Sequence, residues 1–309
     1  MGEKKVYSKL GAAFARGDFV LTGELEPEKT CDLSHLVKEA KEMAPYVVAA
    51  NVTDSPLGIV TINSLAASYI VQRDAGLECI WQLTVRDVNK LGIAGMIMGA
   101  QALGIHNVLS LTGDHPNMGD MPESKPVFDL DSATLVKLVR EMVDTSAING
   151  KEIEAPPKLH VGAAANPNSD PMEAEALKIG RKAEAGAEFI QTQVVYDLDR
   201  TIEFLRAINK YKVPVLLGLF PMKSYAIAKG FDMFVPGVDV PKDILAKWKG
   251  IKTDITDKKA QQEAYDQANY EFFKPFVTEL KAKNLLAGIH CMAVHYPRIF
   301  PKLVEVIKG

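Results

Sequence analysis

The sequence predicts an α/β fold, a single (β/α)8 TIM barrel with extra helices near its C-terminal end. Eight β-prone apolar runs are each followed by a segment with helical periodicity, and 309 residues suit one such barrel with an insertion. The fingerprints of the competing open sheets, G-x-G-x-x-G and G-x-x-x-x-G-K-[ST], do not occur in the sequence. No low-complexity linker divides the chain, so we expect residues 1–309 to form one domain.

The first strand is expected at Phe19–Leu25, and Pro27 stops its regular ladder, which places Glu24 where strand gives way to loop. The other strands are expected at residues 47–52, 79–84, 107–111, 158–163, 189–193, 213–219 and 286–291. Helices are expected at residues 64–74, 90–103, 132–145, 171–185, 198–209, 224–231 and 298–307, with 242–250 and 257–283 as an inserted pair. Asp131 and Ser132 suit the N-terminal cap of the third helix. Eight parallel strands joined by right-handed helical crossovers close into a barrel.

Composition and charge narrow the class of function. The chain has 36 Lys and Arg against 39 Asp and Glu, so it has no basic footprint for nucleic acid or an anionic membrane. The longest apolar stretch, Ile93–Ile105, falls well short of the roughly 20 residues that span a bilayer. We interpret it as a buried helix and expect no membrane insertion. The first ten residues are charged and lack the apolar core of a secretory signal, so we expect a cytoplasmic protein.

The residue pattern offers little support for metal or serine chemistry. Cys31, Cys79 and Cys291 are widely spaced and form no C-x-x-C pair, so neither a disulfide framework nor a zinc or iron–sulfur site is expected. His290 and His295 have an awkward spacing for two ligands on one helix face, and no G-x-S-x-G occurs. We therefore expect no metal site in this chain.

In a (β/α)8 barrel the residues at the C-terminal ends of the strands share one cavity. The corresponding positions of this sequence are strongly polar, and they are Glu24, Glu26, Asn51, Thr53, Asp54, Gln82, Thr84, Arg86, Thr112, Asp114, Asn166, Asn168, Thr192, Gln193, Tyr225, His290 and His295. Such a cavity offers many hydrogen-bond donors and acceptors to a small organic ligand, which favours small-molecule chemistry.

Glu24 is the best candidate for a proton-transferring group, because a pocket that excludes water raises a carboxyl pKa toward neutrality. An ordinary carboxylate at the barrel rim is the alternative. Gly113 permits close approach of the backbone to a ligand, and Asp114 can accept hydrogen bonds from a heterocycle or, alternatively, cap a turn. Arg181 and Lys182, on one expected helix, are either a solvated basic pair or a phosphate-binding pair.

Several short motifs in order resemble the methylenetetrahydrofolate reductase family, whose members are flavin-containing barrels that reduce a folate-bound methylene group to a methyl group. The motifs are TGELEPEKT, NVTD, QLT, LSLTGD, AAANP, GRKAEAGAEFIQTQ and GLFPMKSY. Each motif is weak alone, but together they are specific in their order and spacing. The resemblance extends from about Val20 to Arg298.

The resemblance implies a role for Glu24 and for two sets of binding residues. Glu24 matches the general acid that protonates N10 of methylenetetrahydrofolate and opens its five-membered ring, leaving an N5 iminium that a hydride from flavin N5 reduces. The positions that match substrate-binding residues are Asp114, Gln193, Tyr225 and Arg298. The positions that match flavin-binding residues are Thr53, Gln82, Thr112, Gly113, Asp114, Ala164, Asn166, Arg181 and Lys182.

Two segments depart from the family's pattern. The family usually has aromatic residues and two prolines after its catalytic glutamate, whereas this chain has Leu25, Glu26, Pro27 and Glu28, and Asn166 replaces a common tyrosine beside the flavin. The resemblance implies FAD, with FMN as the open alternative. The resemblance leaves the electron donor open among NADH, NADPH and an electron-transfer partner protein, for which iron–sulfur clusters are one option.

Two other functions stay open on the residues alone. One is a pterin-dependent methyl-transfer barrel that holds no flavin. The other is a non-catalytic subunit that docks a partner protein. Flavin content and oxidation of methyltetrahydrofolate distinguish both from the reductase.

Overall fold

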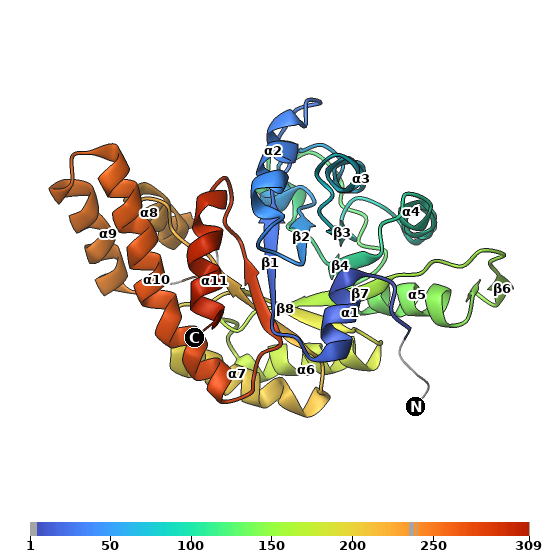
Figure 1. Ribbon diagram of the computed structural model, residues 1–309. Coiled ribbons are helices and arrows are strands. Elements are labelled where there is room, and N and C mark those ends of the chain that lie inside the picture. The colour runs from blue at the N-terminus through green and yellow to red at the C-terminus, as the bar shows by residue number, and fades with distance from the viewer. Residues whose placement is uncertain (1–4, 235–237, 239, 309) are drawn as a thin grey trace.

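The computed structural model of the chain describes residues 5–234, 238 and 240–308. Its parallel strands form a closed barrel in the order β1-β10-β9-β8-β7-β4-β3-β2 (Figure 1). The strands are β1 Val20–Leu25, β2 Ala49–Val52, β3 Cys79–Thr84, β4 Asn107–Leu111, β7 His160–Ala165, β8 Phe189–Val194, β9 Val215–Leu219 and β10 Gly288–Cys291. The predicted (β/α)8 barrel is confirmed.

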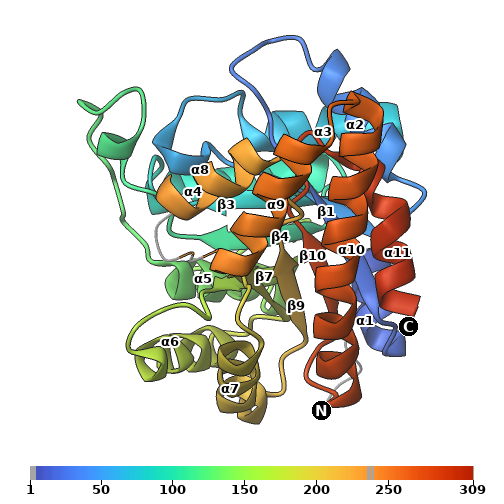
Figure 2. The same cartoon turned by 90° about the vertical axis from the view of Figure 1, so that its left-hand side faces the viewer.

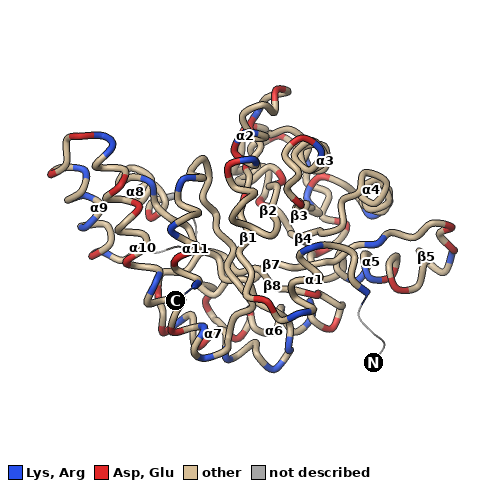
Figure 3. The backbone as a smooth tube through the Cα atoms, in the orientation of Figure 1, with Lys and Arg blue, Asp and Glu red and all other residues tan. Residues whose placement is uncertain are grey.

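Helices surround the barrel, and the inserted helices α9 and α10 pack beside α8 and α11 on one side of it (Figure 2). The helices are α1 Lys9–Arg16, α2 Ser34–Met43, α3 Ser64–Ala75, α4 Lys90–Ala102, α5 Ser132–Asp144, α6 Met172–Glu184, α7 Leu198–Ile208, α8 Tyr225–Phe234, α9 Lys242–Asp254, α10 Lys258–Ala282 and α11 Phe300–Lys308. Short 3-10 turns are η1 Pro56–Gly58, η2 Pro116–Met118, η3 Asn209–Tyr211 and η4 Pro297–Ile299, and a small hairpin pairs β5 Ala147–Ile148 with β6 Lys151–Glu152. Acidic and basic residues are interspersed along the outer helices (Figure 3).

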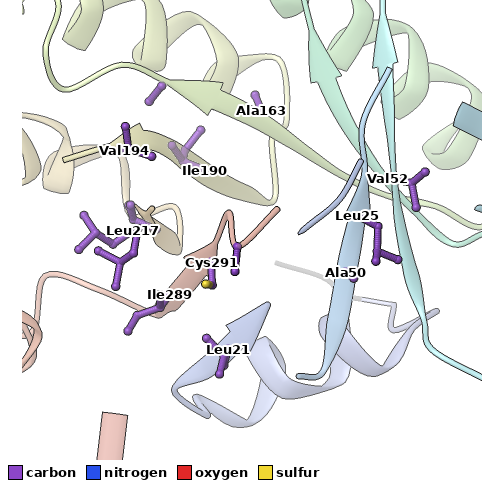
Figure 4. Packing of buried hydrophobic residues seen from close by; sticks show 14 of the residues in the cluster. Leu21, Leu25, Ala50, Val52, Ala163, Ile190, Val194, Leu217, Ile289 and Cys291 are labelled. Atoms are coloured by element: carbon purple, nitrogen blue, oxygen red, sulfur yellow. The ribbon is translucent and has the colours of Figure 1, made fainter. Parts of the chain in front are cut away.

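The strands are apolar on both faces because each face is covered. Their outward side chains, among them Leu21, Val52, Ile190 and Leu217, are buried between the barrel and its helices (Figure 4). The inward side chains near the N-terminal ends of the strands form a second apolar cluster that includes Val20, Ile80, Leu109, Phe189 and Leu216. Leu10 and Ala13 of helix α1 belong to this cluster. Helix α1 therefore covers the end of the barrel at which the strands begin. This packing fills the barrel interior near the N-terminal ends of the strands, and a cavity lies at their C-terminal ends.

Helix α1 was not predicted from the sequence. The side chains that stabilise it come from distant parts of the chain. The Glu78 carboxylate accepts hydrogen bonds from the N–H groups of Lys9 and Leu10, at 2.7 and 2.9 Å. The Ser8 hydroxyl accepts from Gly11 N–H at 2.9 Å and donates to Asn107 Oδ1 at 2.7 Å. These contacts satisfy N–H groups that the first turn of a helix leaves without intrahelical partners.

Helix α4 corrects one expectation. The stretch Ile93–Ile105 was expected to be a buried helix, but only one face of α4 is covered, and Met98 and Leu103 in this stretch are 44% and 37% exposed. An outer helix of a barrel contacts the strands with one stripe, and its other side faces solvent even when the sequence is apolar there. Among the described residues, no helix is both long enough and apolar enough to cross a bilayer.

Glu188, the residue before β8, makes part of the stability of the fold depend on pH. Its carboxylate accepts hydrogen bonds from Val161 N–H and from Arg140 Nη1, at 3.0 and 2.9 Å, and lies 3.0 Å from His160 Nδ1. Burial alone raises the pKa of Glu188, but the hydrogen bond from His160 and the charges of His160 and Arg140 outweigh it, so the pKa is lowered. A lowered carboxyl pKa contributes stability above the unfolded value of about 4.3 and loses it as the pH falls further.

We expect Glu188→Gln to lower the free energy of unfolding by about 1.5–3 kcal/mol at pH 7, because hydrogen bonds to a charged group are lost. The difference from the wild type should shrink as the pH falls below about 4.3. Urea unfolding across this pH range measures both values, with exposed Glu184→Gln as the control. A difference that is the same at all pH values would contradict the assignment.

Candidate active site

A cavity of about 410 Å³ lies at the C-terminal ends of the strands. Its wall combines side chains from β1, β3, β4, β7 and β8 with side chains from helix α6. The predicted site residues that line it are Glu24, Thr53, Gln82, Thr112, Ala164, Asn166, Lys182 and Gln193. The rule that strand ends converge on one cavity therefore brings together residues that are up to 169 positions apart, from Glu24 to Gln193.

Glu24 is the second-to-last residue of β1 and its side chain is 12% exposed. Gln82 Nε2 donates a hydrogen bond to Glu24 Oε2 at 3.3 Å, and His290 Nε2 lies 3.3 Å from the same oxygen. Among the described residues, both hydrogen bonds of this carboxylate go to Oε2 and none goes to Oε1. The carboxylate is thus oriented from one side, and Oε1 is the oxygen left to exchange a proton with a ligand.

His290, on β10, connects Glu24 to a layer of buried polar side chains inside the barrel. The side chain is fully buried, and its Nδ1 lies 3.1 Å from Thr22 Oγ1 and 3.1 Å from Asn51 Nδ2. Asn51 Nδ2 also donates to Gln191 Oε1 at 2.7 Å. The Asn51 amide nitrogen is a donor and lies closer to Nδ1 than to Nε2 of His290, at 3.1 against 3.3 Å. We therefore assign Nδ1 as the acceptor and the ring hydrogen to Nε2, which faces the Glu24 carboxylate. The layer therefore fixes the orientation of Glu24 from below.

Two buried oxygens near this layer, Asn51 Oδ1 and Thr53 Oγ1, have no hydrogen-bond partner among the described residues. Unpartnered buried polar atoms are uncommon and costly, and they mark places where a ligand or water completes the hydrogen bonding. Thr53 lines the cavity, so its hydroxyl is available to a bound molecule.

Lys182 reaches the cavity from α6 and is 8% exposed. Its Nζ donates to Ala164 O at 2.6 Å. Burial lowers the pKa of Lys182, and the nearby Glu175 carboxylate opposes this shift. Glu175 Oε1 accepts from Asn166 N–H at 3.1 Å, so α6 joins the end of β7 at this corner of the cavity. A buried ammonium with donors to spare is suited to bind an anionic oxygen of a ligand.

A bulge in β8 lies in the wall of the cavity. The pairing of β8 with β9 shifts register between Gln191 and Val194, and Gln191, Thr192 and Gln193 all line the cavity. The Thr192 hydroxyl accepts a hydrogen bond from Gly218 N–H at 2.8 Å, which ties the bulge to β9. Gly218 on β9 is required here, because a Cβ at that position would lie 2.3 Å from Thr192 O.

Gly113 and Asp114 join two loops and do not line the cavity. Gly113 has φ +86° and its Cβ position lies 2.9 Å from Thr84 Cβ, so only glycine fits. Asp114 Oδ2 accepts from Leu57 N–H at 2.7 Å, and Arg86 Nη1 donates to Asp114 O at 3.2 Å. These bonds tie the loop after β4 to the loop after β2, which corresponds to the turn-capping alternative for Asp114.

Three other predicted residues lie outside the cavity. Arg181 is exposed and pairs with Asp131 at 3.1 Å. Tyr225 begins α8, and its ring faces Lys252 Nζ at 5.7 Å. Arg298 Nε donates to Asp266 Oδ2 on α10 at 3.0 Å. Their assigned binding roles stay predictions, and the structure does not bring them together with Glu24.

Several cavity residues were not among the predicted site residues. They are Pro56, Leu109, Ser110, Leu111, Ser132, Ala165, Glu175, Gln191 and Met292. Glu175 could have been predicted from helical periodicity, because it lies two turns before Lys182 on the same face of α6. Gln191 could have been predicted as well, because it lies two positions before Gln193 on β8 and alternation puts both side chains on one face of the strand.

The residues present fit a flavin. The cavity offers the amides of Gln82, Asn166 and Gln193, the hydroxyl groups of Thr53 and Thr112, and the ammonium of Lys182. Alternating donors and acceptors of this kind complement the N–H and C=O edge of a heteroaromatic ring, and the unpartnered Thr53 hydroxyl is one place for such a bond. The apolar part of the wall is aliphatic and includes Leu109, Leu111 and Met292.

A family model described as methylenetetrahydrofolate reductase matches residues 9–307. Methylenetetrahydrofolate reductase 2 of Schizosaccharomyces pombe is 25% identical over 228 residues, which are 72% of this chain and 35% of that protein. The 5,10-methylenetetrahydrofolate reductase of Salmonella typhimurium is 26% identical over 192 residues, 61% of this chain and 59% of that protein. The chain thus spans less than two thirds of the length of either relative.

A solved structure shares the fold. It is a protein from Clostridium thermocellum that binds two copies of 5-methyl-5,6,7,8-tetrahydrofolic acid, and it superposes with a TM-score of 0.65 at 16% identity. The superposition covers 97% of this chain and 99% of that one. The barrel, its polar cavity and the match over residues 9–307 agree, and the chain belongs to the methylenetetrahydrofolate reductase family.

Proposed function

We propose that the protein reduces 5,10-methylenetetrahydrofolate to 5-methyltetrahydrofolate, with a flavin bound in the cavity and Glu24 as general acid. The observation that carries this proposal is the Glu24 carboxylate, which lines the cavity and is held at Oε2 by Gln82 and His290. The same-fold protein from Clostridium thermocellum binds 5-methyl-5,6,7,8-tetrahydrofolic acid, and this supports a folate as the ligand here.

The residues of the chain would deliver a proton to the substrate and keep the reacting groups in position. Glu24 Oε1 delivers a proton to N10 of the substrate, which opens the five-membered ring and leaves a reactive N5 iminium. Gln82 and His290 keep the carboxylate in place while this proton moves. An iminium is a strong electrophile, so the protein needs to supply proton delivery and a stacking geometry rather than further activation. Gln193 is the proposed hydrogen-bonding partner of the pterin ring.

The proposed flavin-binding residues in the cavity are Thr53, Gln82, Thr112, Ala164, Asn166 and Lys182. The bound flavin supplies the hydride for the reduction. Lys182 is the residue proposed to meet a phosphate of the cofactor, because it brings a buried positive charge to the cavity wall. Family resemblance favours FAD, and FMN offers the same ring system and one phosphate.

An anaerobic spectroscopic titration tests the proposal. The purified chain is loaded with FAD or FMN, freed of unbound flavin, and treated with 5-methyltetrahydrofolate while the visible flavin absorption is followed. Bleaching supports the reductase, whereas a chain that holds no flavin, or whose flavin keeps its colour, contradicts it. Subsequent trials with NADH and NADPH identify the electron donor, and bleaching by 5-methyltetrahydrofolate alone assigns this role to a partner protein.

A further inference from the structure

A group of histidines and carboxylates lies beside the barrel mouth and outside the cavity. Glu28 follows β1, His35 and Glu39 belong to α2, and His295 follows β10. One ligand atom from each of Glu28, His35 and His295 can be chosen so that all lie within 4.8 Å of one another. These residues have no part in the proposed reductase chemistry, and none of them lines the cavity.

We propose that Glu28, His35 and His295 form a binding site for a divalent transition-metal ion, with Zn²⁺ as the best match. Two imidazoles and one carboxylate are a common protein ligand set for zinc, which leaves a fourth position for water. Metal–ligand bonds of about 2.0–2.2 Å place the ligand atoms of a tetrahedral site roughly 3.3–3.6 Å apart. His295 Nε2 and Glu28 Oε1 are already 3.6 Å apart.

Glu39 prepares His295 for this role. His295 Nδ1 lies 2.8 Å from Glu39 Oε1, and the Glu39 side chain is 10% exposed. A carboxylate that accepts the Nδ1–H of a histidine leaves the lone pair of Nε2 free and fixes the orientation of the ring, as is usual for metal-binding histidines. The free nitrogen points to the side on which Glu28 lies.

His35 is the most exposed of the three proposed ligands. Its side chain is 60% exposed, and its ring centroid lies 5.6 Å from that of His295. A surface histidine one turn before Glu39 on α2 can change rotamer at little cost and bring a nitrogen to the ion. The local charge favours a cation, because Glu26, Glu28 and Glu39 face this region. The ammonium of Lys223 also acts on His295, but it donates to the backbone carbonyls of Val294 and His295, at 3.0 and 3.4 Å.

The proposed site includes the acidic segment that follows β1. Glu28 lies in this segment, together with Glu26 and Pro27. A bound ion would tie this segment to α2 and to the loop after β10, four positions from Glu24. The absence of a metal site expected from the sequence rested on spacing, and these ligands come from three separate segments.

Calorimetric titration of tag-free, chelator-treated protein with Zn²⁺ tests the proposal. We expect one Zn²⁺ per chain, about 10- to 100-fold weaker binding in Glu39→Gln, and a larger loss in His35→Gln and His295→Gln. His106→Gln, at the opposite end of the barrel, is the matched control and should bind as the wild type does.

Two further readouts separate metal binding from a simple ion pair. Co²⁺ in the wild type should give the intense visible bands of a tetrahedral site, and His295→Gln should abolish them. Zn²⁺ should raise the melting temperature of the wild type but not that of His35→Gln, whose circular dichroism checks its folding. Failure to bind Zn²⁺, or binding that survives both histidine substitutions, would overturn the proposal and leave His295 paired with two carboxylates. None of these readouts depends on flavin or on reductase activity.

Discussion

Glu24→Gln should slow the folate half-reaction by about 10²–10⁴-fold, the range that one general acid contributes. Glutamine keeps the shape of the side chain and an oxygen that can accept from Gln82 and His290, at the position where Glu24 Oε2 accepts now. It has no proton to deliver to N10, so proton transfer alone is removed. The loss should appear in both directions, because the acid for reduction is the base for oxidation of 5-methyltetrahydrofolate.

Anaerobic stopped-flow absorbance of the flavin-loaded protein measures this rate directly. Glu26→Gln is the matched control, since Glu26 lies two positions later on the same segment and outside the cavity. It should retain most of the wild-type rate. A Glu24→Gln protein that binds flavin and reacts at the wild-type rate would show that the proton comes from another group.

The barrel could be predicted from the sequence because each strand carries its own apolar run. The bounds of β3 and β4 agree with the expected ones to the residue, whereas β2 begins at Ala49 instead of residue 47. Val47 and Val48 have high β propensity, and Val48 N–H donates to Leu21 O at 2.9 Å, but the ladder pairing with β1 begins at Ala49 opposite Thr22. Local propensity therefore locates a strand well and its first residue less well.

The site could be predicted only in part, because the sequence locates the strand ends but not the contacts made by inserted helices. Strand ends converge by topology, so Glu24, Gln82 and Asn166 were expected at one cavity and lie there. Arg298 follows the insertion that contains α10, and Asp266 of that helix binds its guanidinium. A partner supplied by an inserted helix has no counterpart in the motif that suggested Arg298, so the motif alone could not reveal this contact.

His290 illustrates a role that depends on tertiary contacts. The sequence placed it at the end of the final strand, but its function follows from contacts with Thr22, Asn51 and Glu24 across the barrel. Register between β1, β2 and β10 sets these contacts, and Thr22 lies opposite His290 in the ladder. Sequence patterns predict the strands, and the closure of the barrel determines which side chains meet.

Lys182→Met should weaken flavin binding by about 10- to 100-fold, because a hydrogen bond to a charged group contributes about 1.5–3 kcal/mol. Folding should not suffer in the same way. The buried ammonium is costly to desolvate, and methionine has a similar length and no charge, so the free energy of unfolding of the flavin-free chain should stay the same or rise.

Fluorescence titration with FMN and FAD measures the affinities, and urea unfolding measures the stability. Lys178→Met is the matched control, because Lys178 lies one turn earlier on α6, is exposed and does not line the cavity. It should bind flavin as the wild type does. If Lys182→Met binds both flavins with unchanged affinity, the phosphate is held elsewhere, and the exposed Arg181 on the same helix becomes the residue to test. If Lys182→Met loses affinity and stability together, Lys182 acts by supporting the fold through Ala164 O rather than by binding the cofactor.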